Sequence, residues 1–160
     1  VSKGSILLHS DSKLLKSFQE TARIAGFELD NAQVNAVSYL EPLLFQLVKV
    51  ESKNPLSRLL AKGRTRLGGL YLWGGVGRGK SFLMDSFYNF VPIKKKKRIH
   101  FHRFMQNVHK VLAESQGIKN PLKEIGKNLS KSCALLCLDE FQVTDIGDAM
   151  IMRNLLEALF

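Results

Sequence analysis

Glycine, lysine and serine recur in one segment at the spacing G-x-x-x-x-G-K-[ST], the Walker A pattern of a phosphate-binding loop. Glycines let the backbone form a concave nest of N–H groups, and the helix that follows adds further unpaired N–H donors facing the same anion. We therefore expect a nucleotide site formed by Gly74, Gly75, Val76, Gly77, Arg78, Gly79, Lys80, Ser81 and Phe82.

Two side chains of this loop have distinct expected roles. The Lys80 ammonium would reach the β- and γ-phosphates of ATP and act in catalysis, and the Ser81 hydroxyl would coordinate Mg²⁺. The alternative is a glycine-rich turn without a ligand. An apolar, strand-like run before the loop and an amphipathic helix after it favour the nucleotide site.

An adjacent acidic pair, Asp139 and Glu140, follows the apolar segment 134–138. In a parallel sheet, ligands bind at the carboxyl ends of the strands. We expect Asp139 to hold Mg²⁺ as a Walker B aspartate, and Glu140 to orient or deprotonate the attacking water. Such a pair suits a hydrolase, because one carboxylate serves the metal while the other serves water. The alternative is a solvated acidic turn.

Other polar residues are weaker candidates. His100 and His102 would share one face of a strand, but no third ligand is evident, so a structural or γ-phosphate-sensing role is favoured over a metal site. Arg103 is expected on a core strand and Arg153 on a helix. Neither is nominated as an arginine finger.

The composition is that of a soluble globular protein, with 45% hydrophobic and 24% charged residues. No apolar run is long enough to cross a bilayer, and the opening VSKGSILLHSDSK lacks the apolar region of a signal peptide. Cys133 and Cys137 are expected to be reduced core thiols of an intracellular protein, because an extended chain separates their sulfurs.

Positive charge is concentrated in one part of the chain. The net charge is +10, but residues 62–131 carry 16 basic and 3 acidic side chains. Such a block suits polyanions: nucleotide phosphates, nucleic acid or an anionic membrane surface. We expect the run Lys94–Arg98 to be a solvated loop. The alternative is an electrostatic contact with nucleic acid, membrane or an acidic partner tail.

Hydrophobic periodicity predicts alternating helices and strands after an all-helical start. Helices are expected over 10–26, from Asp30 with an interruption at Pro42, and over 81–90, 108–117, 122–129 and 146–160. Strands are expected over 69–73, 99–104 and 134–138, with a polar connection over 52–68. The fold class is therefore α/β, a parallel three-layer P-loop NTPase sheet. Residues 1–66 form a helical segment with its connection, and 67–160 form the first part of the ATPase core.

Four stretches resemble the ZapE-type cell-division ATPases, an AAA+ family with mitochondrial relatives. They are residues 27–40, 69–88, 98–112 and 135–160. The resemblance implies ATP and Mg²⁺ as cofactors, a ring of identical subunits, and a protein substrate such as the FtsZ division ring. It implies a bacterial cytoplasmic protein, peripheral to the inner membrane, or a mitochondrial matrix protein in a eukaryote.

The family continues beyond the last residue here, Phe160, with a sensor strand, an arginine-finger region and a helical lid. We therefore expect these 160 residues alone to hydrolyse ATP poorly or not at all. Two other functions remain open on the sequence alone. One is a DNA-associated ATPase resembling a helicase loader, and the other is a module that binds ATP without hydrolysing it.

Overall fold

The computed structural model describes residues 12–51, 68–115 and 117–159. Its chain divides into two compact units, Val1–Pro92 and Ile93–Phe160. The polar connection predicted over 52–68 lies almost wholly outside the described residues. The predicted domain boundary between residues 66 and 67 falls there too, so it stays a prediction.

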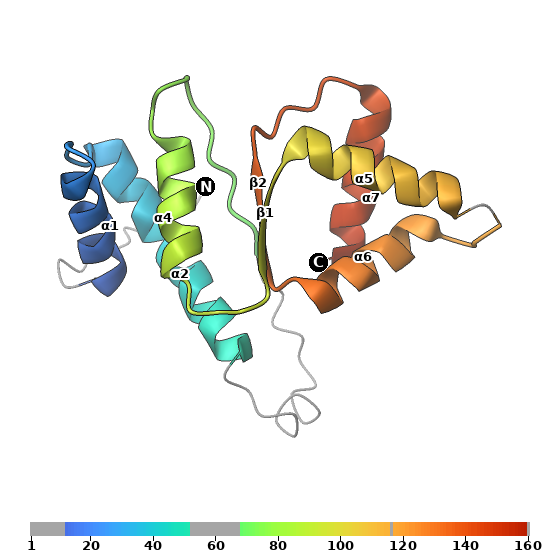
Figure 1. The fold of residues 1–160 in the computed structure, drawn as a ribbon, viewed down its shortest axis with the longest axis horizontal. Helices are drawn as coiled ribbons and strands as arrows, with labels where there is room; N and C mark the ends of the chain where they lie inside the picture. The colour runs from blue at the N-terminus through green and yellow to red at the C-terminus, as the bar shows by residue number, and fades with distance from the viewer. Residues whose placement is uncertain (1–11, 52–67, 116, 160) are drawn as a thin grey trace, which may run out of the picture. The chain divides into compact units, whose positions relative to one another are not determined.

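Three helices form the described part of the first unit: α1 (Lys13–Ile24), α2 (Asn31–Glu51) and α4 (Lys80–Phe90). The Ser12 side chain caps α1 by accepting a hydrogen bond from the Leu15 N–H at 3.1 Å. After α1 the chain turns at Gly26, whose φ is 84°. Both α1 and α2 pack against α4 (Figure 1). The buried core of this unit includes Leu14, Phe18, Ala22, Val37, Leu40, Leu47, Leu83 and Phe87.

The sequence predicts a kink or a restart of the helix at Pro42. The restart is wrong, because α2 is one helix of 21 residues that contains Pro42, and the kink stays a prediction. Proline removes one helical hydrogen bond and crowds the preceding turn, but tertiary packing can outweigh that cost. Here Val37, Leu40 and Leu47 of the same helix are buried.

Within the described ranges, α2 included, no helix combines the length and apolar character needed to cross a bilayer.

The strand predicted over residues 69–73 does not form in the structure. The segment has no regular secondary structure, and Tyr71 and Trp73 are 65% and 83% exposed. A strand is stabilised by its ladder partners and by a buried face. In the described part of the chain the one sheet consists of two other strands. The prediction of a buried strand from the apolar run 69–73 is therefore wrong.

The second unit places a parallel two-stranded sheet beside three helices (Figure 1). Strand β1 (Lys96–His100) pairs with β2 (Leu135–Asp139), and Arg98 lies opposite Cys137. Helices α5 (Phe101–Glu114) and α6 (Pro121–Ser132) connect the strands, and α7 (Ile146–Leu159) follows β2. The core brings together Phe101, Phe104, Met105 and Val108 of α5 with Met152 and Leu155 of α7. The predicted parallel pairing and the predicted helices of this unit are confirmed.

The strand predicted over residues 99–104 is partly wrong. Strand β1 ends at His100, and α5 begins at Phe101, so His102 and Arg103 lie on a helix and are exposed. Buried apolar side chains recur from Phe101 at the i, i+3, i+4 and i+7 spacing of a helix, and this period prevailed over the local alternation. The basic run is also not a loop throughout, because Lys96–Arg98 belong to β1.

The two cysteines are free thiols in buried positions, as predicted. Cys133 follows α6 and Cys137 lies within β2. Burial raises the pKa of the Cys133 thiol, and hydrogen bonds and charge from Lys97 only partly offset that effect. Cys133 is therefore a poor nucleophile and acts as a small apolar group in the core.

Candidate nucleotide-binding site

The predicted phosphate loop lies in the first unit and leads directly into α4. Gly77 and Gly79 adopt left-handed conformations with φ of 76° and 75°, which favour glycine over any residue with a Cβ. Gly79 is the N-cap of α4 and has no side chain to bond the helix N–H groups. Lys80 and Ser81 are the first two helical residues. The first-turn N–H groups and the positive end of the helix dipole therefore lie next to the loop.

The Lys80 ammonium bonds back to the loop itself. Its Nζ donates to the carbonyl oxygens of Gly74 at 2.9 Å and Gly75 at 2.7 Å. This places a positive charge over the loop, where the sequence pattern predicts phosphate. The next residues differ in exposure: Ser81 is exposed, and Phe82 is half-buried with its ring 4.9 Å from that of Phe27, edge to face.

A second set of side chains ties the loop to the start of α2. Asp30 and Gln33 form a reciprocal cap: Asp30 Oδ1 accepts from the Gln33 N–H at 2.8 Å, and Gln33 Oε1 accepts from the Asp30 N–H at 2.9 Å. Gln33 Nε2 also donates to the Arg78 carbonyl at 3.3 Å, and the Arg78 guanidinium donates to Asp30 Oδ2 at 3.1 Å. This network was not predicted from the sequence. The D-x-x-Q cap was its one visible signal.

In the second unit, Asp139 is the last residue of β2 and forms an ion pair with Arg98 of β1. Arg98 donates to Asp139 Oδ2 at 2.8 Å, and the Glu140 N–H donates to Oδ1 at 3.0 Å. Burial alone would raise the Asp139 pKa, but the hydrogen bonds from Arg98 and Glu140, with the positive charge of Arg98, outweigh it and the pKa is lowered. Asp139 is therefore an anion at neutral pH.

Glu140 has a very different environment from its neighbour. Its side chain is 79% exposed, and its backbone is left-handed with φ of 52°, which is uncommon for a residue with a Cβ. Its Oε2 lies 3.8 Å from His100 Nδ1. Asp139 is thus held in an ion pair while Glu140 is open to solvent, so the two carboxylates have different environments.

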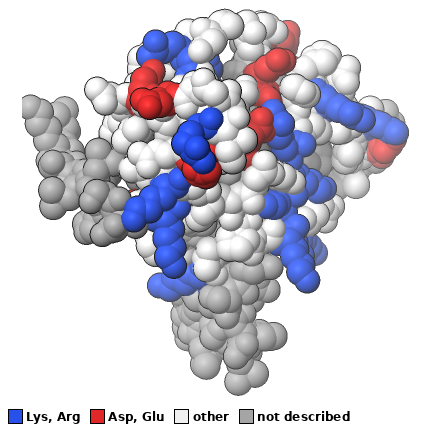
Figure 2. All heavy atoms as spheres, turned by 60° about the vertical axis from the view of Figure 1, so that its left-hand side comes forward, with Lys and Arg blue, Asp and Glu red and all other residues white. Residues whose placement is uncertain are grey.

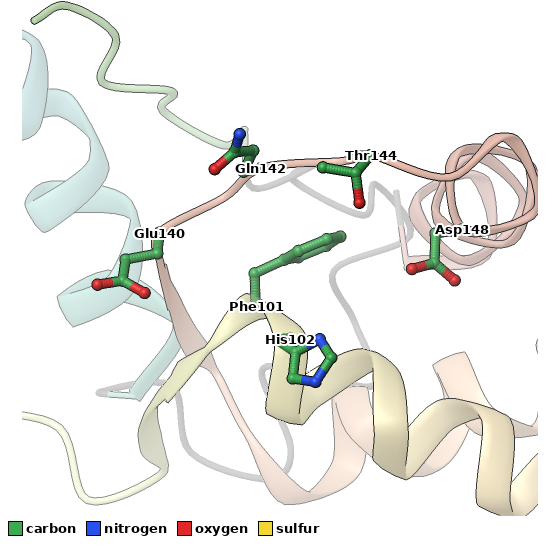
Figure 3. A pocket seen from close by; sticks show the side chains of 6 residues that line it. All are labelled: Phe101, His102, Glu140, Gln142, Thr144 and Asp148. Carbon is green, nitrogen blue, oxygen red and sulfur yellow. The ribbon is translucent and has the colours of Figure 1, made fainter.

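Glu140 lines a cavity of about 240 Å³ in the second unit. Figure 3 shows the loop bearing Gln142 and Thr144 above the Phe101 ring, with Glu140 and Asp148 on opposite sides. His102 also lines the cavity. The two histidines do not share one strand as predicted, because His100 ends β1 and His102 lies on α5. Among the described residues, no three His, Cys, Asp or Glu side chains form a group able to hold a metal ion.

The predicted site residues therefore fall into two sets. Gly74–Phe82 lie together in the first unit, and Asp139 and Glu140 lie together in the second. The predicted approach of Lys80 to Asp139 across a bound nucleotide concerns both units, so it stays a prediction.

Comparison with known proteins identifies relatives of this chain. The family model of the AFG1-like ATPases matches residues 13–160. The chain belongs to the AFG1-like ATPase family. This match confirms the resemblance to ZapE-type ATPases.

Individual relatives of this AFG1-like chain come from bacteria, fish and yeast. It is 40% identical to the cell division protein ZapE of Escherichia coli over 93% of its own length, which is 42% of ZapE. It is 40% identical to lactation elevated protein 1 homolog B of Danio rerio over 58% of its length, 20% of that protein. It is 38% identical to protein C115.02c of Schizosaccharomyces pombe over 77% of its length, 28% of that protein. No solved structure matches the chain.

Proposed function

We propose that the chain binds ATP with Mg²⁺ at Gly74–Phe82 and supplies part of an ATP-hydrolysing site. The observation that carries the proposal is the loop with left-handed Gly77 and Gly79, which leads into the N-terminus of α4 and has the Lys80 ammonium bonded over it. Membership of the AFG1-like ATPase family supports the same function. The β1–β2 pair would belong to the three-layer parallel sheet of a P-loop ATPase.

The donor chemistry of this chain fits Mg²⁺. The ion prefers carboxylate and hydroxyl oxygens. Asp139 is ionised, and its two oxygens accept hydrogen bonds from the Arg98 guanidinium and the Glu140 N–H. Asp139 and the Ser81 hydroxyl would hold the ion, which when bound neutralises negative charge on the transferred phosphoryl group.

The chain's own residues have separable roles in the proposed reaction. Lys80 binds the β- and γ-phosphates, and the loop N–H groups orient them. Arg98 keeps Asp139 anionic and fixes its orientation through the 2.8 Å bond. Glu140, exposed beside the cavity, accepts a proton from the attacking water.

For the whole protein we propose a homo-oligomeric ring that remodels a protein partner, such as the FtsZ division ring, at the cytoplasmic face of a bacterial membrane or in the mitochondrial matrix. The cell-division role of the Escherichia coli relative supports this proposal.

A nucleic-acid-tracking function has less support. Within the basic run, Arg98 bonds Asp139 and Lys95 Nζ donates to the Lys131 carbonyl at 3.0 Å. Figure 2 shows that some lysines and arginines lie beside acidic side chains, whereas others lie on a stretch of surface without them. Ion pairs within the units include Arg23–Glu20, Arg78–Asp30, Lys127–Glu124 and Arg153–Glu157. Pairing lowers the charge available to phosphates.

The test compares two variants of the intact protein with a matched control. Glu140→Gln should retain ATP affinity and lose turnover by about 100-fold or more, because the proton acceptor is removed. Lys80→Ala should lose both. The control, Glu157→Gln, removes an exposed carboxylate that pairs with Arg153 on α7 and should change neither. Undiminished turnover in Glu140→Gln would refute the assigned role, and ATP binding unaffected by Lys80→Ala would refute the site.

A further inference from the structure

We infer that Gln33, on α2, is a positioning residue for the phosphate loop. It acts by holding the Arg78–Gly79 peptide so that the Gly79 N–H faces the phosphates of the nucleotide. The inference rests on the proposed function, since it assumes that Gly74–Phe82 bind phosphate. It adds a residue that lies more than 40 positions before the loop in the sequence.

The first step is the connectivity of the Gln33 side chain. Its amide has one acceptor and two donors, and both ends are used: Oε1 accepts from the Asp30 N–H, and Nε2 donates to the Arg78 carbonyl. Asp30 is used in the same way, by the Gln33 N–H and by the Arg78 guanidinium. The cap of α2 and the phosphate loop are therefore one closed network of three residues.

The second step is the geometry of the peptide unit. A trans peptide is planar, and its C=O and N–H groups point in opposite directions. Because the Arg78 carbonyl is directed at Gln33, the Gly79 N–H of the same peptide is directed away from Gln33. Gly79 is the N-cap of α4, so this N–H joins the donors at the helix start that face an anion.

The third step is the space at Gly79. A Cβ built there would lie 2.5 Å from Gln33 Nε2, so the side chain of α2 occupies the volume that any other residue would fill. At Gly77 nothing lies within 4 Å of such a Cβ. Of these two glycines, only Gly79 is approached closely by the Gln33 side chain. Gly79, with φ of 75°, restricts its backbone less than a residue with a Cβ would, so a partner for the Arg78 carbonyl limits the orientations of that peptide.

The test uses two substitutions at Gln33 that separate the capping role from the positioning role. Gln33→Glu keeps the acceptor for the Asp30 N–H but has no donor for the Arg78 carbonyl. Gln33→Met is uncharged and loses both bonds. The matched control is Ser12→Ala, which removes the N-cap of α1 in the same unit, where the Ser12 side chain bonds the Leu15 N–H of its own helix.

In the intact protein, both Gln33 variants should raise the Kd for ATP and for ADP by about three- to tenfold, the loss expected for one hydrogen bond. KM for ATP should rise by the same factor, with kcat at saturating ATP within about twofold of the wild type, since the effect is on ground-state positioning. Ser12→Ala should leave Kd and KM unchanged, although it removes a helix cap.

Each contrary outcome has its own meaning. If both Gln33 variants bind ATP as Ser12→Ala does, Gln33 only caps α2 and the inference is wrong. If Gln33→Glu weakens binding and Gln33→Met does not, the effect is charge repulsion and the inference is again wrong. If the wild type itself does not bind ATP, or binds it as well without Lys80, the proposed function fails instead.

Discussion

Replacing Gly79 with alanine should destabilise the first unit more than the same replacement at Gly77. The two glycines have nearly equal left-handed φ angles, 75° and 76°, so an alanine at either position has the same backbone cost. They differ in their surroundings. The new methyl group would lie 2.5 Å from Gln33 Nε2 at position 79 and would have nothing within 4 Å at position 77.

The size of the difference follows from these two terms. A residue with a Cβ in the left-handed region costs about 1–2 kcal/mol, which applies to both variants. At position 79 the Gln33 amide must also rotate away. It is the flexible end of a side chain, so the added cost is its bond to the Arg78 carbonyl, about 0.5–1.5 kcal/mol. We expect a loss of about 1–2 kcal/mol for Gly77→Ala and about 1.5–3.5 kcal/mol for Gly79→Ala.

Hydrogen exchange of the α2 and α4 amides measures this loss in the first unit alone, without assuming that the whole chain unfolds in one step. The same two substitutions are then made together with Gln33→Ala. Without the Gln33 amide, the two glycine variants should cost the same. Equal costs in the wild-type background, or a larger cost at Gly77, would refute the reasoning.

Three further predictions concern the core, the ion pair and the helix proline. Phe18→Ala should lower the free energy of unfolding by about 3–5 kcal/mol, because this ring is fully buried. Phe45→Ala, at a ring 72% exposed, should change it by less than about 0.5 kcal/mol. Thermal unfolding of both variants measures the difference. Arg98→Met should raise the Asp139 pKa, measured by carboxyl NMR. Because the wild-type pKa is lowered, the stability that Asp139 contributes is present above its unfolded pKa and is lost as pH falls through the folded pKa. The wild type should therefore exceed the variant in stability at neutral pH and lose that advantage in acid as Asp139 becomes protonated. Pro42→Ala should raise the stability of α2 by about 1–3 kcal/mol, seen as slower amide exchange around position 42, and faster exchange there would contradict it.

Much of the site could be predicted from the sequence because its signals are local. A left-handed turn favours glycine, and Gly77 and Gly79 both have left-handed φ angles. The spacing of these glycines before Lys80 therefore indicated a turn that leads into a helix, and α4 begins at Lys80. Helix caps are also local, since they join residues three apart, as Ser12 does with Leu15. Membership of the AFG1-like ATPase family rests on a match over residues 13–160.

The predictions that failed concern segments whose conformation depends on distant partners. Residues 69–73 and 99–104 are apolar or alternating over a length that suits a strand, a loop or part of a helix equally well. The first has no ladder partner among the described residues, and in the second the apolar face of α5 joins the core with α7. Sequence periodicity over five or six residues cannot choose between such outcomes.

The sequence by itself therefore predicted the phosphate-loop pattern, the acidic pair, most of the helices and the family resemblance that the comparison confirms. Tertiary structure decided which side chains control them: Gln33 at the Arg78 carbonyl, 45 residues away, and Arg98 at Asp139, 41 residues away. The physical reason is that a backbone turn or a cap is fixed by the few residues that form it. A contact over 40 residues is fixed by strand register and helix packing, which depend on the whole unit.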